Sequence, residues 1–254
     1  MTTFTAVTYN VLAQSFVRPD RYPLCSPEAL DPARRHALLL ARVEALDADL
    51  LCLQELEPAV FDDVRALLEP THDAAHAKHG RRPDGIAVFA RRSRFTWLGH
   101  EALPGGNALI ANLTLDGQPL RVACAHLTWQ PESTPPAEHA GYRQMLELLA
   151  HRDAAAPDAT WLFAGDFNAT SQSPVLSAAL DRGMDESCRT QRPWDTCAVN
   201  GRPRKLDYLL FSRSRLTSTP APLPKLTRDS ILPSRTDPSD HLPLTVTFTA
   251  HPSR

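Results

Sequence analysis

Six apolar runs in the sequence border a carboxylate, a carboxamide or an imidazole. These polar groups are Asn10 in TYNVLAQ, Glu55 in LCLQELE, His126 in ACAHLTWQP, Asp166 and Asn168 in LFAGDFNAT, Asp207 in KLDYLLF, and Asp240 with His241 in PSDHLPL. Short apolar runs are typical of strands, so we interpret the polar groups as lying at the C-terminal edges of strands. Strand ends of one domain can converge on a cleft, and we expect a catalytic site there.

The oxygen donors in this set predict a hard divalent cation. Glu55, Asn10, Asp166, Asn168 and Asp240 match the ligand preference of Mg²⁺ or Mn²⁺, and no paired Cys or HExxH spacing suggests zinc. Two carboxylates 4 Å apart repel each other by about 1 kcal/mol even in water, and a divalent ion offsets this repulsion. An ion at Glu55 would polarise a phosphate and stabilise the leaving oxygen. The sequence leaves open whether one ion or two bind.

The remaining groups suit phosphoryl chemistry, in which negative charge develops on the non-bridging oxygens. His126 and His241 are the candidates for holding that charge. We assign His241, oriented by Asp207, as a transition-state donor or acid/base, because a carboxylate fixes a histidine tautomer and favours its charged form. Asp166 is the candidate for positioning or deprotonating the attacking water, with Asn168 beside it.

Each of these residues also has a structural explanation. Asn10 could be a buried structural amide, Glu55 could lead as a solvated residue into the next helix, and Asp166 could start an Asx-type turn. Asp207 could form an edge-strand salt bridge, and a lone histidine such as His126 is more often a core residue. Separate structural roles do not explain why several apolar strands each end in a ligand-type group, so we favour the joint, catalytic explanation.

Two kinds of segment must position these groups. Strands are predicted at Phe4–Asn10, Asp49–Gln54, Gly85–Ala90, Ala108–Leu115, Leu120–Leu127, Thr160–Ala164, Leu206–Phe211 and Leu244–Thr249. Helices are predicted at Ala33–Leu46, Glu57–Leu68 and Glu138–His151, with Pro32 at the first helical position after Asp31.

The order of these segments predicts the fold class. Asp116–Gly117 favours a hairpin, whereas the outer strands are joined through helices, so the sheets should be mixed. We therefore expect an α/β fold, a four-layer sandwich of two packed mixed sheets flanked by helices. The stretch from Pro193 to Pro238 is rich in Pro, Ser, Thr and Arg with one clear strand, and we expect long surface loops there.

Composition sets further limits. The chain has 254 residues, 43% hydrophobic and 22% charged, without a linker-like stretch, so we expect a single domain over residues 1–254. We find no signal peptide or apolar run long enough for a membrane span. Five cysteines without CxxC spacing indicate reduced, mostly buried thiols in a cytoplasmic protein. The net charge of −2 gives no field that attracts long polyanions, so attraction for phosphate must be local.

The motifs in this order resemble the endonuclease/exonuclease/phosphatase superfamily, with the DNase I-like fold, over nearly the whole chain. TYNVLAQ followed by DPARR, and HLTWQP, which is similar to a His-x-x-Trp-x-Pro pattern, resemble the CCR4/nocturnin/Angel branch, which contains deadenylases. The resemblance implies catalytic or metal-binding roles for Asn10, Glu55, Asp166, Asn168, Asp207 and His241. It also implies that His126 contacts the scissile phosphate and that Pro131 packs on adenine. We expect Trp129, in the same HLTWQP motif, to bind substrate as well.

The sequence departs from that branch in one place. Deadenylases of the branch have a base-stacking aromatic residue shortly before the strand aspartate, and here the segment reads GRPRKLD. Arg202 or Arg204 could instead stack on a base or bind a phosphate. The leucine-rich repeats of eukaryotic deadenylases are absent, so we expect no obligate protein partner.

These observations predict a Mg²⁺-dependent enzyme that hydrolyses phosphodiester bonds of RNA or short oligonucleotides, as a deadenylase-like 3′-end exonuclease. An enzyme of the same fold acting on a small nucleotide or a cyclic-phosphate end is the first alternative, favoured by the near-neutral charge, and a DNA endonuclease is the second. A binding module without activity is disfavoured, because it would not need Glu55, Asp166 and His241 together.

Overall fold

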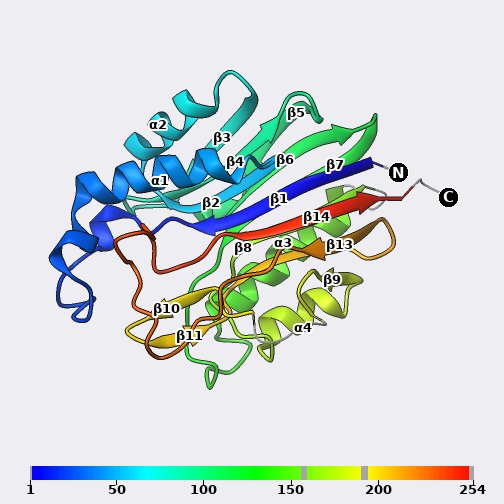
Figure 1. Cartoon of the computed structure of the whole chain (residues 1–254). Coiled ribbons are helices and arrows are strands. Elements are labelled where there is room, and N and C mark those ends of the chain that lie inside the picture. Colours follow the sequence, from blue (N-terminus) through cyan, green and yellow to red (C-terminus); the bar gives the residue numbers. More distant parts are fainter. Residues whose placement is uncertain (1, 156–158, 190–193, 252–254) are drawn as a thin grey trace.

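The computed structural model describes residues 2–155, 159–189 and 194–251. Two six-stranded sheets form its centre (Figure 1). The strands of sheet A, in spatial order, are β13 (Leu216–Pro220), β14 (Leu244–Ala250), β1 (Thr2–Asn10), β2 (Leu50–Leu56), β4 (Gly85–Arg91) and β3 (His72–Lys78). Those of sheet B are β5 (Phe95–Ala102), β6 (Ala108–Leu115), β7 (Gln118–His126), β8 (Thr160–Asp166), β12 (Asp207–Ser212) and β9 (Met184–Glu186).

Each sheet is mixed. The β1–β2 and β7–β8 pairs are parallel, and the other pairs within the two sheets are antiparallel. Each parallel pair is joined by a helical crossover, as parallel strands require. The short elements are η1 (Gln14–Phe16), η2 (Pro27–Leu30), η3 (Pro104–Gly106) and a separate hairpin of β10 (Cys197–Val199) and β11 (Arg202–Arg204).

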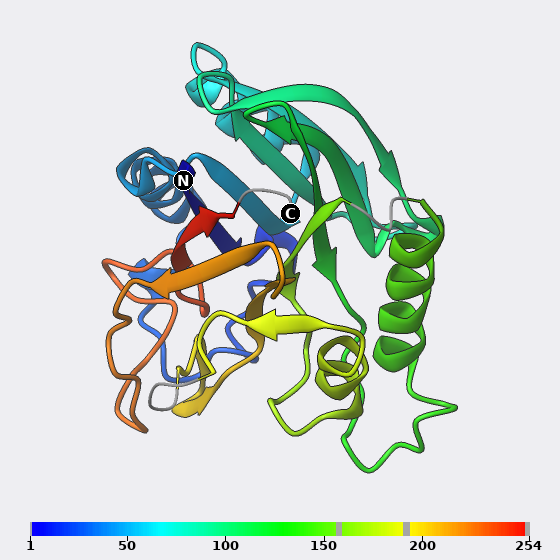
Figure 2. The same ribbon diagram turned by 90° about the vertical axis from the view of Figure 1, so that its right-hand side faces the viewer.

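Helices cover the outer face of each sheet (Figures 1 and 2). Side chains of α1 (Pro32–Leu46) and α2 (Pro58–Leu68) pack on sheet A, and those of α3 (Ala140–Ala155) and α4 (Pro174–Leu180) pack on sheet B. A third cluster fills the space between the sheets. Both faces of the central strands are buried, so strands such as β2, β4 and β8 are largely apolar. The predicted four-layer sandwich is confirmed.

The local signals found in the sequence form the expected elements. All eight predicted strands and three predicted helices are present, with ends shifted by a few residues. The helix α1 begins at Pro32, and the Asp31 side chain accepts a hydrogen bond of 2.9 Å from the Arg34 amide. Asp116 and Gly117 have φ values of 50° and 76°, as a type I′ hairpin turn requires.

The expectation of long loops between Pro193 and Pro238 is confirmed for residues 221–238, which form no helix or strand, and was wrong for much of the described part before them. Besides β12, that region forms β10, β11 and β13, while Pro193 itself lies outside the described residues. The sequence reading also missed β3, β5, α4 and β9. The edge strands β3 and β5 were missed because polar side chains interrupt both, so that they lack an apolar run; β5 is also largely exposed.

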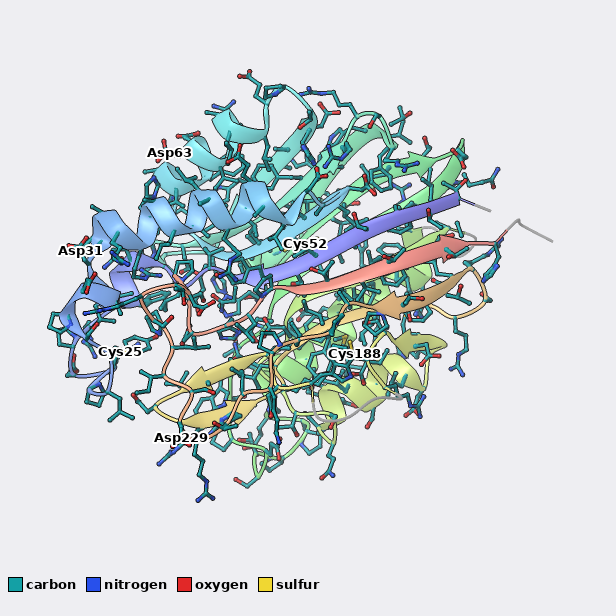
Figure 3. The ribbon with its side chains drawn as sticks, in the orientation of Figure 1. Cys25, Asp31, Cys52, Asp63, Cys188 and Asp229 are labelled. Carbon is teal, nitrogen blue, oxygen red and sulfur yellow. The ribbon has the colours of Figure 1, made fainter. Side chains whose placement is uncertain are left out.

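The cysteines are free, as expected. Four are buried, and Cys25 is partly exposed. Figure 3 labels Cys25, Cys52 and Cys188 at separate places in the molecule. Within the described ranges, no helix is long and apolar enough to cross a membrane.

Candidate active site

One end of sheet B carries a row of catalytic side-chain types. His126 at the end of β7 pairs in register with Asp166 at the end of β8, which pairs in turn with Asp207. Residues paired across neighbouring strands point to the same face of a sheet, so the three side chains lie side by side. The prediction that all the polar groups follow strands was wrong for Asp207, which begins β12, and for the Asp240–His241 pair, which precedes β14. Both still reach this end because β12 and β14 are antiparallel to their neighbours.

A bulge in β2 brings Glu55 to the same place. The register shifts between Gln54 and Leu56, and Glu55 has a φ of 58°. Gln54 is buried and donates to Cys124 across the two sheets. An unbulged strand would direct the next side chain to the opposite face, whereas the extra residue directs the Glu55 carboxylate to the strand end.

Asn10 connects the two sheets at this point. Its amide nitrogen donates to Glu55 Oε1 at 3.1 Å and to Asp166 Oδ2 at 3.0 Å. Its oxygen accepts from the Leu12 amide at 3.0 Å. The Asn10 side chain therefore bridges two carboxylates, and in this orientation its oxygen is directed to the backbone and away from the position where a metal ligand was expected.

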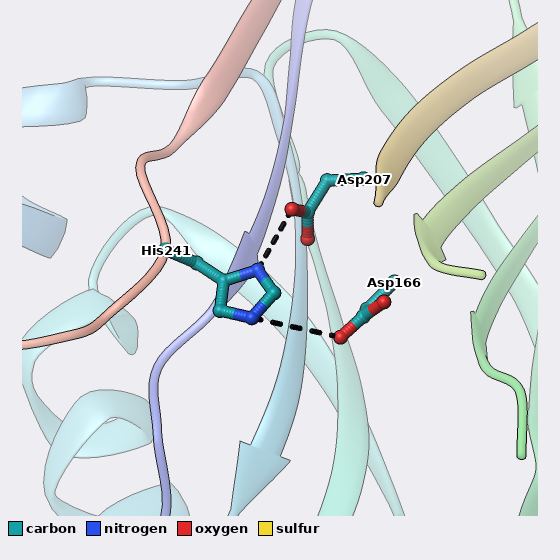
Figure 4. Close-up of side chains that lie close together, drawn as sticks. All are labelled: Asp166, Asp207 and His241. Carbon is teal, nitrogen blue, oxygen red and sulfur yellow. Dashed lines mark hydrogen bonds and ion pairs between the residues drawn. The ribbon is translucent and has the colours of Figure 1, made fainter. Parts of the chain in front are cut away.

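His241 lies between two aspartates (Figure 4). Its Nδ1 is 2.8 Å from Asp207 Oδ2, and its Nε2 is 3.8 Å from Asp166 Oδ2. Burial favours the neutral imidazole, but the Asp207 carboxylate and its hydrogen bond, together with neighbouring groups such as Asp166, outweigh burial and raise the pKa of His241 well above its usual value. Burial, together with Asp207, raises the pKa of Asp166.

The Asp166, Asp207 and His241 side chains each offer a ligand-type atom within 4.8 Å of the others, so this buried group could hold a metal ion. The short contact between His241 and Asp207 is a hydrogen bond that uses one oxygen and one nitrogen of the group. Mg²⁺ prefers oxygen ligands, so carboxylates on the Glu55 side of Asp166 match it better.

His126 forms a second imidazole site facing the same carboxylates. Its Nε2 is 3.8 Å from Asp166 Oδ2 and 3.9 Å from Glu55 Oε1. Its Nδ1 is 4.0 Å from the fully buried Asp84, which Arg82 holds with two hydrogen bonds. Burial lowers the pKa of His126 to about 4, so this imidazole is neutral near pH 7.

Asn168 and Asp240 complete the ring of polar groups. The backbone amide of Asn168 donates to Asp166 Oδ1 at 2.8 Å, and Asn168 has a φ of 49°. An Asx-type turn therefore fixes this segment. Asp240 Oδ2 accepts from the Tyr22 hydroxyl at 3.0 Å. Burial, then the Asp240 carboxylate, raises the pKa of Glu55 to about 7.

A pocket of about 480 Å³ opens onto these groups. Its lining includes Glu55, Asp166, Asn168, Asp240 and His241, together with Trp129, Arg202 and Arg204. Trp129 is 55% exposed at the rim. Pro131 is exposed and is not part of the lining, so among the four expected substrate contacts it alone lies outside this pocket.

Several residues that position the site were not singled out from the sequence. They are Tyr22, Arg35, Asp84, Thr196 and Ser239. Asp84 immediately precedes β4, which is antiparallel to β2, so a search of strand starts as well as strand ends would have found it.

Arg35 connects the loop after β1 to the segment before β14 through hydrogen bonds. It is 5% exposed, and its guanidinium donates to the carbonyls of Val11, Leu12 and Pro238 and to the Gln14 side chain. The loop after β1 is thereby fixed against the segment that carries Asp240 and His241.

Comparisons with known proteins agree with this architecture. A family model described as the Endonuclease/Exonuclease/phosphatase family matches residues 7–241. The chain is 26% identical over 315 residues to 2′,5′-phosphodiesterase 12 of Bos taurus, covering 94% of this chain and 50% of that protein. It is 29% identical over 281 residues to nocturnin of Rattus norvegicus, covering 94% of this chain and 64% of that protein. The chain thus spans only half to two thirds of the length of these relatives.

Solved structures show the same fold. ANGEL2, described as a 2′,3′-cyclic phosphatase and bound to adenosine-2′,3′-vanadate, has a TM-score of 0.79 at 21% identity, covering 97% of this chain and 95% of that one. The human nocturnin catalytic domain with bound sulfate has a TM-score of 0.75 at 22% identity, covering 98% and 94%. The family model spans most of the chain and the fold agrees with it, so the chain belongs to the endonuclease/exonuclease/phosphatase family.

Proposed function

We propose that this protein is a divalent-metal-dependent phosphoesterase that hydrolyses phosphodiester bonds of RNA or short oligonucleotides. One observation carries the proposal: Asn10 and Glu55 of sheet A meet Asp166 of sheet B and His241 of the loop before β14 within hydrogen-bonding or ion-pair distances. Relatives named as a 2′,5′-phosphodiesterase and a 2′,3′-cyclic phosphatase support a phosphate ester as substrate.

The donor set at Glu55 fits Mg²⁺ or Mn²⁺. Burial and Asp240 make the ionised form of Glu55 unfavourable without a counter-charge, which is the condition that a bound cation relieves. Glu55 would hold the ion, with Asp240 and the Asp166–Asn168 turn supplying further oxygens at the pocket wall. When bound, such an ion supplies Lewis-acid polarisation of the phosphate and stabilises the leaving oxygen.

The chain's own groups divide the remaining work. Asp166, whose basicity is raised by burial and by Asp207, orients or deprotonates the attacking water. Protonated His241 donates through Nε2 to a non-bridging oxygen, because Nδ1 is engaged by Asp207. Neutral His126 contacts the phosphate from the other side of Asp166, and Asn10 keeps the two carboxylates of the site in place.

The test is a substrate panel assayed with Mg²⁺, with Mn²⁺ and with EDTA. Oligo(A), mixed RNA, single-stranded DNA, a cyclic-phosphate end and NADP(H) separate the 3′-end exonuclease from the small-nucleotide phosphatase and the DNA endonuclease. The proposal requires metal-dependent hydrolysis of RNA or an oligonucleotide. Hydrolysis confined to a small nucleotide would reject the RNA substrate, and turnover undiminished in EDTA would reject metal dependence.

We also propose that residues 1–254 act as one domain in the cytoplasm without an obligate protein partner or a membrane. Five unpaired thiols support a reducing compartment. Size-exclusion chromatography of the active protein tests whether it works alone, and activity found only in a larger complex would overturn this.

A further inference from the structure

The β10–β11 hairpin is fixed against the catalytic groups. The Ala198 amide donates to the Asp240 carbonyl at 3.0 Å, and Cys197 forms a β-bridge with His241. The Thr196 hydroxyl accepts from the amide of Asp207, the partner of His241. Anything on this hairpin is therefore held at a fixed position relative to His241.

The tip of the hairpin is anchored as well. Asn200 and Gly201 have φ values of 49° and 68°, which is the type I′ geometry of an Asn-Gly turn. Asn200 donates to the Arg21 carbonyl at 3.0 Å, and a Cβ at Gly201 would lie 2.4 Å from the Arg228 carbonyl oxygen. Figure 1 shows the hairpin as β10 and β11, lying beside the segments that precede β14. These contacts hold the hairpin in place as one wall of the pocket, so its side chains point in a defined direction.

Two arginines of this wall line the catalytic pocket. Arg202 and Arg204 are both exposed and both belong to the pocket lining. They are two residues apart in a strand, so they share one face with about 7 Å between their Cα atoms. Lys205, on the alternate face, is engaged by Glu186 and lies over the Tyr208 ring.

In the part of the chain that the structure describes, no carboxylate neutralises either guanidinium. Within the described ranges, Arg202 and Arg204 have no ion pair or hydrogen bond from their side chains. Other arginines, such as Arg35, Arg82 and Arg91, contact carboxylates or carbonyls. Unpaired guanidinium groups at the wall of a pocket are suited to bidentate binding of an anionic ligand.

The base of a nucleotide would find a contact other than the arginines in this pocket, the Trp129 side chain. Trp129 offers an exposed aromatic face at the rim, and its side chain comes from a different segment, after β7. The β10–β11 hairpin carries no aromatic side chain, so its contribution to the pocket is charge. A metal ion held at Glu55 would bind one phosphate of the substrate. Arg202 and Arg204 provide positive charge for a second phosphate.

We propose that Arg202 and Arg204 bind a second phosphate of the substrate, so that the enzyme prefers a nucleotide unit flanked by two phosphates over one with a single phosphate. This inference rests on the proposed function, because it places the first phosphate at the Glu55 and Asp166 side of the pocket. The substrate class is then a short oligonucleotide or a nucleotide bisphosphate, not a nucleoside with one terminal phosphate.

The experiment compares the affinity of the full chain, in Mg²⁺, for a nucleoside 3′,5′-bisphosphate and for the matching 5′-monophosphate by titration calorimetry. The wild type should bind the bisphosphate about tenfold or more tightly than the monophosphate, since a charge-assisted hydrogen bond contributes about 1.5–3 kcal/mol. Arg202→Ala and Arg204→Ala should each reduce that ratio, and the double variant should bring it near one. Lysine at either position should restore part of the ratio, because the charge is kept and the bidentate geometry is lost.

Arg65→Ala is the matched control, because Arg65 is an exposed arginine on α2 outside the pocket, and the ratio should stay as in the wild type. A ratio near one in the wild type, or an undiminished ratio in the double variant, would overturn the inference. An equal loss of affinity for both ligands would also overturn it, because the arginines would then contact base or sugar.

Hydrolysis of an RNA dinucleotide that carries a 5′-phosphate, and so has two phosphates, is measured in the same preparations and separates the two proposals. Hydrolysis with a ratio near one rejects only the second-phosphate site. A tenfold ratio without hydrolysis of any phosphodiester supports the second-phosphate site and rejects the proposed reaction.

Discussion

At the scale of single residues, structural and chemical roles coincide. Asp166 forms an Asx-type turn through Oδ1 and faces His241, His126 and Asn10 through Oδ2. The structural explanation of the GDFN motif was therefore correct, and it is compatible with the catalytic one: the turn fixes the carboxylate so that its second oxygen is presented to the other groups.

Asp207→Asn tests the pairing of His241. In the wild type the raised pKa keeps His241 protonated at neutral pH, and the charge is lost only as pH rises through that raised value. Asparagine removes the counter-charge and leaves burial, so the pKa should fall. We expect the alkaline decline of kcat to move to lower pH, and kcat near pH 7 to drop by about 10² or more.

The measurement is kcat as a function of pH, with circular dichroism to verify folding. Asp62→Asn, at an exposed aspartate on α2, is the control and should keep the wild-type profile. An unshifted alkaline limb in the Asp207→Asn protein would mean that His241 does not act in its charged form.

At the scale of elements, the sequence predicted the strands that are buried and apolar. It missed strands that are very short or that carry several polar side chains. The buried strand β8 has a continuous apolar run, and β1 alternates apolar residues with threonine; their ends located Asp166 and Asn10. The strand β3, sequence HDAAHAK, has no such run. The three-residue strands β10 and β11 were missed because they are too short for periodicity, although the Asn-Gly turn between them is a hairpin signal.

Residues that hold the loops of the site in place could not be predicted from the sequence for another reason. Arg35 lies in the DPARR motif, which was noted for its resemblance alone, and its four hydrogen bonds join segments about 200 residues apart in the chain. No pattern within a single segment encodes such a contact. Tyr22 is likewise defined by its partner, Asp240.

Arg35→Ala should destabilise the protein and weaken the site. The substitution leaves several buried carbonyls without a donor, so we expect a loss of at least about 2 kcal/mol in the free energy of unfolding. For a chain of this size that lowers Tm by roughly 5 °C, which a thermal melt detects.

The neighbouring Arg34→Ala is the control. Arg34 is on the same helix and exposed, pairing with Glu28 at the surface, so its removal should cost about 1 kcal/mol or less. Equal effects of the two substitutions would contradict the positioning role of Arg35.

At the scale of the whole molecule, two sheets act as the two halves of one site. Glu55 comes from sheet A and Asp166 from sheet B, and Asn10 contacts both. The core between the sheets fixes their separation and hence the distances among the proposed catalytic groups. The surface, with a net charge of −2, adds no general attraction for nucleic acid.

A weak salt dependence should follow from this charge balance. If two arginines make the phosphate contacts beyond the metal, log(kcat/KM) for single-stranded RNA should fall with log[salt] with a slope of about −1.4. Measurements at fixed Mg²⁺ with oligonucleotides of increasing length test this. A slope that steepens with length would mean that the protein contacts an extended backbone.

The most direct test of the metal-dependent site is the Mg²⁺ dependence of oligonucleotide hydrolysis in the wild type and in Glu55→Gln. Glutamine keeps the shape of the side chain and removes its charge, so we expect hydrolysis to fall by about 10² or more and half-saturation to require more Mg²⁺, with folding retained. Wild-type hydrolysis should stop in EDTA and return with Mg²⁺. A Glu55→Gln protein with the wild-type rate and the wild-type Mg²⁺ requirement would contradict the account.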